Sequence, residues 1–424
     1  MALKPIKEVI ACVVDYGSFI HVAQRISRDV KKVYYCNPAW QHSYPKWNEY
    51  MLGEGVEGIE RIDSIWPHFD EIDWFIFPDL FQGELQEWLR SKGKVVYGAG
   101  KGEEMEVYRD EFKEVMEDAG MDMSPYKVIV GLDKLRAHLE KTKDVYIKTN
   151  VVRGNMETFH WHEMKLSKPI LDEMEHSMGI FKNEQTFIVE TPIKDSVEYG
   201  GEWFIVGDKY ADRCTVGIEA KDAGYINKVV ATGDMPKGLK EINKKLAPKF
   251  GFFGYRGQYS NEVKVTKDGK NFLLDMTCRC GEPNTSLQEE LITNYTEVLW
   301  SIANGILPDV ESKEGDFGVE VIIKSDWATE EPQPIYFPKK YARYVKIKNL
   351  VVQDGINYYI PTGNIPMKEI GAVVFPAKTL KDAFEGVRKV AESVQGYCIK
   401  INCDALDEVM DEIKKLTEFG VKLF

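Results

Sequence analysis

Short β-rich apolar runs alternate with helical patterns over the first hundred residues. The apolar runs cover residues 7–15, 30–36, 74–77 and 94–97, with helical patterns to about residue 28 and over residues 80–91. Strands that alternate with helices are typical of a parallel, doubly wound sheet. We therefore expect an α/β domain over residues 1–102, with Asp15, Gly17 and Asp79 at strand ends, where such sheets bind ligands.

The middle of the chain, residues 103–310, carries a second set of periodic segments. Residues 103–120 have the apolar stripe of one amphipathic helix, which Gly120 ends. Strands are predicted at residues 128–130, 145–148 and 186–193, with a helix at residues 132–141 between the first two. Mixed strands and helices therefore continue beyond the first domain.

A β-hairpin is predicted over residues 257–277. Two alternating apolar runs flank the turn Lys-Asp-Gly at residues 267–269, which is a hairpin pattern. Residues i and i+2 of a strand share a face, so Asp275 and Thr277 point the same way, and pairing brings Glu262 beside them. Two carboxylates on one sheet face suit a hard cation such as Mg²⁺, although solvated surface acids would give the same pattern.

The hairpin and the residues after it resemble the metal-binding end of the ATP-grasp enzymes, and within them the phosphoribosylamine–glycine ligases. That family has a Glu on the first strand and then Glu-x-Asn-x-Arg-Phe-Gly-Asp-Pro-Glu-Thr. Glu262 and Asp275 correspond to the two acids, Thr277 to the Asn and Arg279 to the Arg, and Gly-Glu-Pro-Asn-Thr at residues 281–285 follows. The resemblance implies a metal site at Glu262, Asp275 and Thr277.

The same resemblance implies residues that hold the phosphates of ATP. Arg109 takes the place of a phosphate-contacting Lys in the first turn of the predicted helix, and Lys148 corresponds to the Lys that binds the α- and β-phosphates. The following segment corresponds to the phosphate loop, with Arg153, Gly154 and Asn155 as donors from backbone or side chain.

The hinge between the two lobes of the resembled enzymes holds the adenine, and it corresponds to Glu190, Thr191, Pro192 and Ile193. Proline has no N–H, so adenine contacts would use the neighbouring amides. Two acids follow the hinge. Glu198 is a candidate for the ribose hydroxyls, and Glu202 occupies a position where the family often has an acid.

Two arginines are candidates for catalysis. Arg279 follows Asp275 and Thr277 on the same strand face, and its planar guanidinium suits a phosphate or a carboxylate. Arg256 enters the hairpin and is a second candidate for contact with an anion.

The resemblance implies a multidomain protein with α/β and α+β domains. A Rossmann-like pre-grasp domain covers residues 1–102, and an ATP-grasp domain covers residues 103–310, with a mobile lobe at about 125–190. A small mixed α/β domain covers residues 311–424, after an acidic linker at residues 309–316. We expect this last domain to pack against the grasp domain and to have no site of its own.

Composition excludes some classes of protein. The net charge of −13 disfavours a protein that grips nucleic acid over a broad surface. Seven scattered cysteines and an N-terminus without a signal peptide fit the reducing cytoplasm. No apolar run approaches the roughly 18 residues that a membrane span needs, so we expect no membrane partner.

The predicted function is an ATP-dependent carboxylate–amine ligase that works through an acyl phosphate. Its cofactors would be ATP and Mg²⁺, with Mn²⁺ as an alternative metal. Small-molecule carboxylate and amine substrates are expected, and a small amino acid such as glycine is the favoured carboxylate. Two alternatives stay open, namely coupling of an amino acid to a modified nucleic-acid base or other large acceptor, and a nucleotide-binding protein without catalysis. The sequence determines neither the acceptor nor the oligomeric state.

Overall fold

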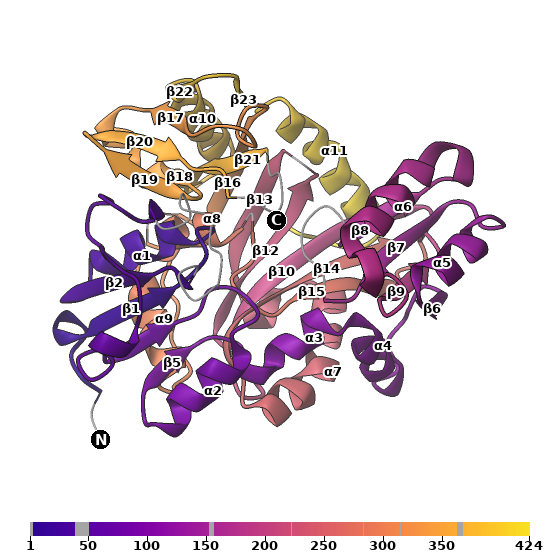
Figure 1. Cartoon of the computed structure of the whole chain (residues 1–424), viewed down its shortest axis with the longest axis horizontal. Coiled ribbons are helices and arrows are strands. Elements are labelled where there is room, and N and C mark those ends of the chain that lie inside the picture. Colours follow the sequence, from indigo (N-terminus) through magenta and orange to yellow (C-terminus); the bar gives the residue numbers. More distant parts are fainter. Residues whose placement is uncertain are drawn as a thin grey trace.

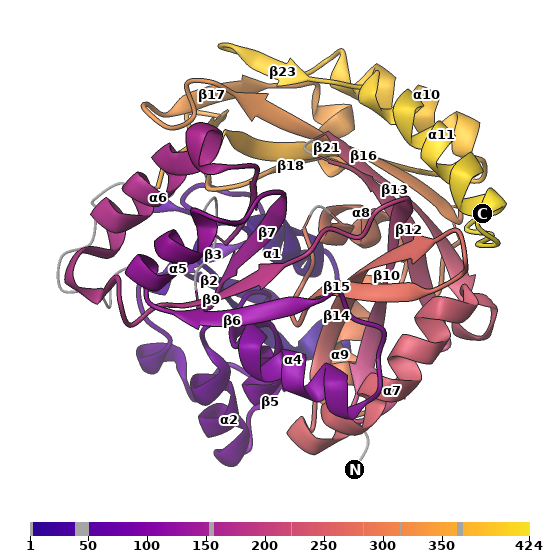
Figure 2. The same cartoon turned by 90° about the vertical axis from the view of Figure 1, so that its right-hand side faces the viewer.

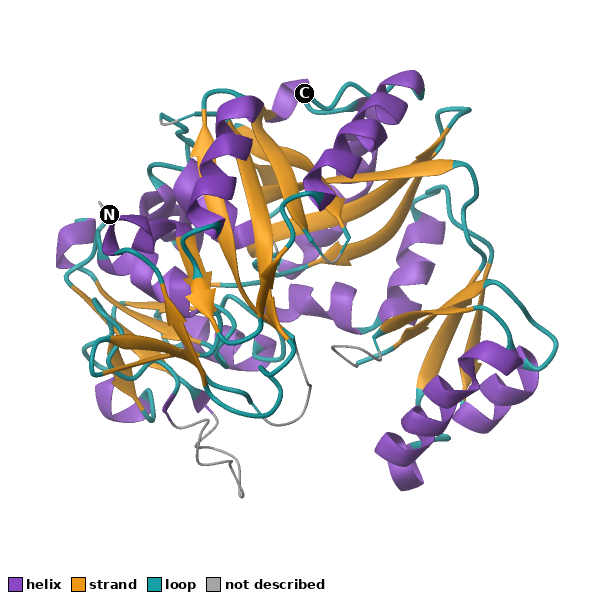
Figure 3. Cartoon of the chain, turned by 90° about the horizontal axis from the view of Figure 1, so that it is seen from above, coloured by secondary structure: helices purple, strands orange, loops and turns teal. Residues whose placement is uncertain are grey.

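The computed structural model describes residues 3–38, 51–151, 157–221, 223–282, 284–313, 315–362 and 368–424. Figure 1 shows three regions: an N-terminal sheet, a large central sheet that the C-terminal segment extends, and a lobe that projects to one side. The view from above separates this lobe from the rest (Figure 3). Within the described ranges, no helix combines the length and the hydropathy that crossing a membrane requires.

The N-terminal region is a five-stranded parallel sheet in the order β3-β2-β1-β4-β5. Its strands are β1 (Ile10–Val14), β2 (Lys32–Cys36), β3 (Glu60–Ile62), β4 (Trp74–Ile76) and β5 (Val95–Tyr97), and its helices are α1 (Ile20–Ser27) and α2 (Gly83–Ser91). Both faces of β1 are buried, with Ala11 and Val13 in one apolar cluster and Cys12 and Val14 in another. This double burial explains the continuous apolar run, and the predicted doubly wound sheet is confirmed.

Two short helices, α3 (Glu104–Val107) and α4 (Arg109–Asp118), replace the single helix predicted over residues 103–120. The helix breaks at Tyr108, whose φ of −100° and ψ of 76° lie outside the helical region. The break makes Arg109 the first residue of α4.

The projecting lobe is a four-stranded antiparallel sheet in the order β6-β9-β7-β8. It comprises β6 (Tyr126–Val130), β7 (Val145–Thr149), β8 (Thr158–Trp161), β9 (Thr186–Glu190), α5 (Leu132–Leu139) and α6 (Met164–Met178). Its buried residues, among them Leu135, Ile147, Trp161 and Phe187, form an apolar cluster separate from the rest of the molecule. Residues 126–190 are thus a distinct packing unit.

The central sheet has ten strands, eight of them in the continuous order β15-β14-β10-β12-β13-β16-β21-β18. The strands before residue 310 are β10 (Ser196–Val206), β11 (Lys209–Tyr210), β12 (Arg213–Ala220), β13 (Gly224–Ala231), β14 (Arg256–Thr266) and β15 (Asn271–Thr277), and the helices are α7 (Lys237–Phe253), α8 (Asn284–Leu291) and α9 (Tyr295–Ala303). The predicted hairpin is β14–β15, and Glu262 lies directly opposite Asp275.

The C-terminal segment continues the central sheet. Strand β16 (Phe317–Ser325) pairs with β13, so that Gly318 lies opposite Asn227, and β18 (Val345–Ile347), β21 (Glu369–Ala377) and β23 (Ile399–Ile401) extend the sheet. A small sheet is formed by β17 (Gln333–Tyr336), β19 (Leu350–Gln353), β20 (Ile356–Tyr359) and β22 (Gln395–Gly396), with α10 (Leu380–Ala391) and α11 (Ala405–Glu418) on the outside. Figure 2 shows β17, β23, α10 and α11 arched over the central sheet, and the pairing of β16 with β13 confirms the expected packing.

Candidate active site

The projecting lobe and the central hairpin meet at Lys148, near the end of β7. The Lys148 ammonium lies 2.9 Å from Oδ2 of Asp275 on β15 and 3.3 Å from Oε2 of Glu190 on β9, and it donates to the carbonyl of Leu274 at 2.7 Å. Its side chain is 5% exposed. Although burial lowers the pKa of Lys148, the carboxylates of Asp275 and Glu190 raise it above the ordinary lysine value. Lys148 is therefore a buried, charged group.

Arg109 approaches the same carboxylate from α4. Its Nε lies 3.6 Å from Oδ1 of Asp275, its Nη2 pairs with Glu157, and its Nη1 donates to the carbonyl of Thr149 at 3.2 Å. Burial raises the pKa of Asp275, but Lys148 and Arg109 hold it below the ordinary aspartate value. The structure confirms that Arg109 and Lys148 face the same site. Their contact with phosphate stays a prediction.

Lys113 is a third cation of this cluster, and our reading of the sequence missed it. It lies one helical turn after Arg109 on α4, its ammonium pairs with Glu190, and the residue is only 5% exposed. The spacing i, i+4 on an amphipathic helix places both side chains on one face, and this signal could have identified Lys113. The cations Arg109, Lys113 and Lys148 are thus matched by the carboxylates of Glu157, Glu190 and Asp275.

The predicted adenine hinge begins where β9 ends. Glu190 is the last residue of β9, and its side chain faces Lys113 and Lys148. The amide of Thr191 donates to the carbonyl of Pro125 at 3.0 Å. Pro192 and Ile193 lie in the connection to β10, where the Ile193 carbonyl accepts a hydrogen bond from Ser196. The hinge therefore joins the projecting lobe to the central sheet, and adenine contact stays a prediction.

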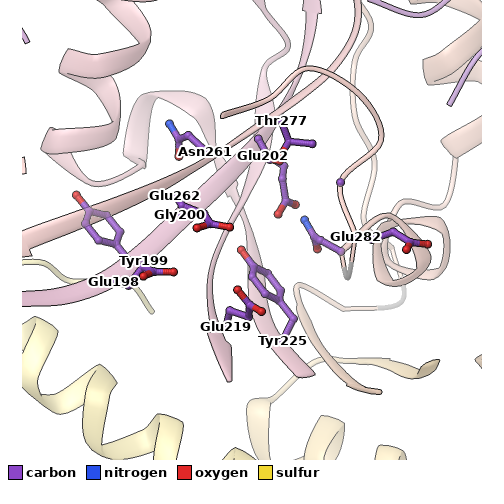
Figure 4. Close-up of a pocket in the computed structure, with 13 residues that line it drawn as sticks. Glu198, Tyr199, Gly200, Glu202, Glu219, Tyr225, Asn261, Glu262, Thr277 and Glu282 are labelled. Carbon is purple, nitrogen blue, oxygen red and sulfur yellow. The ribbon is translucent and has the colours of Figure 1, made fainter. Parts of the chain in front are cut away.

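A pocket lies on the face of the central sheet that carries Glu262, and carboxylates are the charged groups of its lining (Figure 4). Glu198 on β10, Glu219 on β12 and Glu262 on β14 each bring a carboxylate oxygen within 4.8 Å of the others. Lys221 lies 2.8 Å from Glu198, 2.8 Å from Glu219 and 3.7 Å from Glu262. Glu219 was missed because it comes from a strand outside the hairpin motif. Below, these three glutamates are called the acidic triad.

Desolvation raises the pKa of Glu262 to about 8, opposed by Lys221 and reinforced by the charges of Glu198 and Asp275. Glu262 and Asp275 lie opposite each other as predicted, but the Asp275 carboxylate contacts cations whereas Glu262 belongs to the acidic triad. Thr277 lines the pocket. Mg²⁺ prefers oxygen ligands such as carboxylates. Glu262 and Asp275, on neighbouring strands, therefore fit a divalent cation, and Thr277 lies in the wall of the pocket that Glu262 also lines.

Glu202 is buried beside the pocket. Its Oε2 accepts hydrogen bonds from Thr215 at 2.6 Å and from Gln288 at 3.1 Å. Burial raises its pKa to about 8. Both Glu198 and Glu202 lie on the pocket face of β10, and their predicted part in nucleotide binding is untested.

The two predicted catalytic arginines have different surroundings. Arg279 lies 3.1 Å from Oε1 of Glu106 and 3.4 Å from Oδ1 of Asp79, so it joins the end of β15 to α3 and to the N-terminal region. Arg256 lies at the start of β14, and its Nη1 donates to the carbonyl of Ala303 at 3.3 Å. It lies six positions before Glu262 along β14, about 20 Å at the rise of a strand. The structure does not bring Arg256 to the site, because it marks the opposite end of β14.

The remaining predicted phosphate contacts, Arg153, Gly154 and Asn155, lie outside the described residues.

No protein-family model and no curated protein sequence matches the chain significantly. Three solved structures illustrate the similarity of the fold. The phosphoribosylamine–glycine ligase of Thermotoga maritima has 14% identity and a TM-score of 0.68, over 93% of this chain and 100% of that one. The biotin carboxylase domain of Hydrogenobacter thermophilus 2-oxoglutarate carboxylase, solved with MgADP, ADP and bicarbonate, has 13% identity and a TM-score of 0.65, over 96% and 94%.

The L-amino acid ligase of Bacillus licheniformis has 12% identity and a TM-score of 0.57, over 92% of this chain and 99% of that one. All three alignments span nearly the whole of both chains, so the likeness includes the parallel N-terminal sheet, the two antiparallel sheets and the C-terminal mixed segment. The predicted three-part architecture is confirmed, and the chain has the ATP-grasp fold.

Proposed function

We propose that the protein is an ATP-dependent carboxylate–amine ligase, which forms a carbon–nitrogen bond and releases ADP and phosphate. The observation that carries this proposal is the convergence of Lys148 and Arg109 on Asp275 between the projecting lobe and the central sheet. Buried cations next to an acid pair suit a nucleotide whose phosphates carry a metal ion. The ATP-grasp fold supports the same reading, since a phosphoribosylamine–glycine ligase and an L-amino acid ligase share it.

In the proposed reaction, a carboxylate oxygen of one substrate attacks the γ-phosphorus of ATP, and ADP leaves. The amine of the second substrate then attacks the acyl carbon, loses a proton, and displaces phosphate. Lys148 and Arg109 would hold phosphate oxygens in place of Asp275 and Glu157. Glu262 and Asp275, with Thr277, would hold Mg²⁺ or Mn²⁺. The metal would neutralise charge on the phosphates. These residues work by positioning and electrostatics, so no side-chain nucleophile is needed.

A small amino acid such as glycine is the proposed carboxylate, and the reducing cytoplasm is the proposed setting. The nucleotide would lie along the hinge, with Glu190, Thr191, Pro192 and Ile193 at the adenine. Coupling to a modified nucleic-acid base or another large acceptor is the second candidate function, which the net charge of −13 disfavours. A nucleotide-binding protein without catalysis is the third, because Thr277 replaces an amide ligand of the resembled family.

The test is ADP release from ATP and Mg²⁺ over a panel of amino acids crossed with amines, including phosphoribosylamine and a nucleic-acid acceptor. Carboxylate labelled with ¹⁸O should transfer one labelled oxygen to the released phosphate if an acyl phosphate forms. ATP binding without turnover over the whole panel would favour the protein without catalysis. Turnover that releases phosphate without label would contradict the acyl phosphate.

A further inference from the structure

The acidic triad brings three carboxyl groups together on adjacent strands, and an internal cation lies among them. Carboxylates within 4.8 Å of one another repel unless a cation lies between them. Lys221 supplies that cation from the turn after β12, but its side chain is 58% exposed. Ion pairs of exposed lysines contribute little to stability. Another cation can therefore take the place of the Lys221 ammonium at small cost to the fold.

The floor of the pocket is bare backbone beside the triad. Gly200 on β10 lies directly opposite both Glu262 and Gly217, and Gly217 lies opposite Asn227, so these residues form one row across the sheet. A Cβ at Gly217 would lie 2.5 Å from Cε1 of Tyr225, and one at Gly200 would lie 2.2 Å from a backbone carbonyl. Neither position can carry a side chain without displacing its neighbours. The ring of Tyr225 packs over Gly217, and Gly200 lines the pocket with backbone alone.

A buried amide beside the floor lacks one hydrogen-bond partner. Asn284, the first residue of α8, lines the pocket and is 2% exposed. Its Oδ1 accepts a hydrogen bond from Asn227 at 2.6 Å, but its Nδ2 has no partner among the described residues. An unpaired buried donor costs free energy, and a ligand with an acceptor atom would satisfy it. The pocket is therefore equipped for a polar ligand.

The size of the pocket limits that ligand. The pocket has a volume of about 60 Å³. One water molecule needs about 10–15 Å³ of a cavity volume measured in the same way. The space accommodates about four to six non-hydrogen atoms. Five of the thirteen described residues that line it are glutamates, and none is an arginine or a lysine. A small ligand fits this lining if it carries positive charge, whereas a phosphate ester does not.

We propose that this pocket binds the ammonium group of a small substrate, which replaces the Lys221 ammonium at Glu198, Glu219 and Glu262. An ammonium donates three hydrogen bonds, one to each carboxylate of the acidic triad. An acceptor atom elsewhere in the ligand receives the free N–H of Asn284. A carboxylate has two oxygens, so Glu262 can serve Mg²⁺ and the ammonium together.

The proposal rests on the proposed ligase function only where it calls the ligand a substrate. Binding of the ligand itself is measurable without turnover. Two substrates of a ligase could present this group, namely the acceptor amine and the α-ammonium of an amino acid. Ethylamine represents the first and glycine the second. Ethylene glycol tests the need for charge, and phosphoethanolamine tests the exclusion of a phosphate ester.

The experiment is calorimetric titration of the full-length protein with these four probes at pH 8, with and without a non-hydrolysable ATP analogue and Mg²⁺. Ethylamine, glycine or both should bind, and ethylene glycol and phosphoethanolamine should bind at least tenfold more weakly. Glu219→Gln should weaken ammonium binding at least tenfold, because it removes one charge from the acidic triad. Lys221→Met should strengthen it at least threefold, because it removes the competing cation. A folding defect cannot produce this gain.

Glu385→Gln is the matched control, since Glu385 is 67% exposed on α10 in a similar lysine pair. It should bind the probes as the unchanged protein does. Stronger binding of glycine assigns the pocket to the amino acid, and stronger binding of ethylamine assigns it to the acceptor. Three results would each overturn the proposal. They are no ammonium binding in any condition, ethylene glycol binding as tight as that of the ammonium probes, and unchanged ammonium affinity in both Glu219→Gln and Lys221→Met. Ammonium binding without binding of the ATP analogue would overturn the ligase function and leave the pocket assignment standing.

Discussion

At the scale of single residues, Asp275 is a counter-charge as well as a predicted metal ligand. It contacts Lys148 and Arg109 in the nucleotide-free structure, so nucleotide phosphates must compete with it. We predict that Asp275→Asn strengthens metal-free ATP binding about threefold or more, because Lys148 and Arg109 each lose one of their acidic partners. Mg²⁺-dependent phosphate release should fall at least 100-fold, about 2.7 kcal/mol in transition-state terms. Calorimetry and a phosphate-release assay with Mg²⁺ titration check the two effects.

The control for Asp275→Asn is Thr277→Asn on the same strand, which should keep or raise turnover, because an amide oxygen is the better metal ligand. Turnover at the unchanged rate in Asp275→Asn would place the metal elsewhere.

Lys113 provides a prediction about stability. Its ammonium pairs with the buried Glu190, and loss of one partner of a buried pair costs about 3–5 kcal/mol. Because Lys148 remains beside Glu190, we predict that Lys113→Met lowers the free energy of unfolding by about 3 kcal/mol. Urea denaturation measures this change. Lys237→Met, at a side chain that is 89% exposed on α7, should change it by less than about 0.5 kcal/mol, and equal stability of the two variants would show that the buried pair contributes nothing.

The site residues that the sequence predicted share one property, which is a place in a local motif. Glu262 and Asp275 follow from the hairpin, whose period of two and tight turn determine which residues share a face. Glu219 and Lys221 could not be found in that way. Their proximity to Glu262 depends on the pairing of β12 with β10 and of β10 with β14, and no local pattern encodes this pairing.

At the scale of elements, the seam between α1 and α8 combines buried charges. His21 on α1 lies 2.8 Å from Glu289 on α8 and 3.7 Å from Glu282, and all three side chains are mostly buried. Although burial lowers the pKa of His21, the two glutamates raise it to about 9. The pKa values of Glu282 and Glu289 fall to about 2, since nearby Lys348, Lys346 and His21 outweigh the effect of burial.

The sign of the pH dependence follows from these shifts. The raised pKa of His21 stabilises the fold below about pH 6.5, and this contribution is lost as the pH rises to about 9. The lowered pKa values of the glutamates stabilise it above about pH 4.5, and that contribution is lost toward pH 2. We predict that the protein loses about 3 kcal/mol of stability between pH 6.5 and 9 through His21. Urea denaturation over this range should show a steeper slope in the unchanged protein than in His21→Gln, where the raised pKa values of Glu202 and Glu262 still contribute. An equal slope in both proteins would assign it to groups other than His21.

The break between α3 and α4 shows a limit of periodicity as a guide to elements. Tyr108, Phe112, Val115 and Met116 fit one helical stripe, so the sequence predicts a continuous helix. Tyr108 instead leaves the helical region while Arg109 turns toward Thr149 and Glu157. The contacts of Arg109 are tertiary and therefore invisible in the local pattern.

At the scale of the whole molecule, the central sheet crosses the predicted boundary between the second and third domains. The sequence predicted the strands on both sides of the segment 309–316, but the pairing of β13 with β16 joins residues about ninety positions apart. Such long-range register is not encoded in a local window. The parallel N-terminal sheet was easier to predict, because burial of both faces leaves continuous apolar runs.

The continuity of the sheet predicts the effect of truncation. A chain that ends at residue 316 loses β16 and α11, and it exposes the edge of β13 and the apolar residues that α11 covers on β12 and β13. We expect it to aggregate or to lack a cooperative thermal transition, because an uncovered apolar edge strand pairs with other chains. Soluble expression followed by thermal melting checks this, and a truncated chain that melts as cooperatively as the full chain would show that the C-terminal segment is an independent domain.

The account depends on one claim, that the protein binds Mg-ATP between the projecting lobe and the central sheet. Calorimetric titration of the full chain with ATP in excess Mg²⁺ tests it most directly, with Lys148→Ala compared against Lys134→Ala on the exposed face of α5. A charge-assisted hydrogen bond contributes about 1.5–3 kcal/mol. The account predicts one ATP per chain, at least tenfold weaker binding in Lys148→Ala and unchanged binding in Lys134→Ala. No binding by the unchanged protein, or equal affinity in Lys148→Ala and Lys134→Ala, would contradict it.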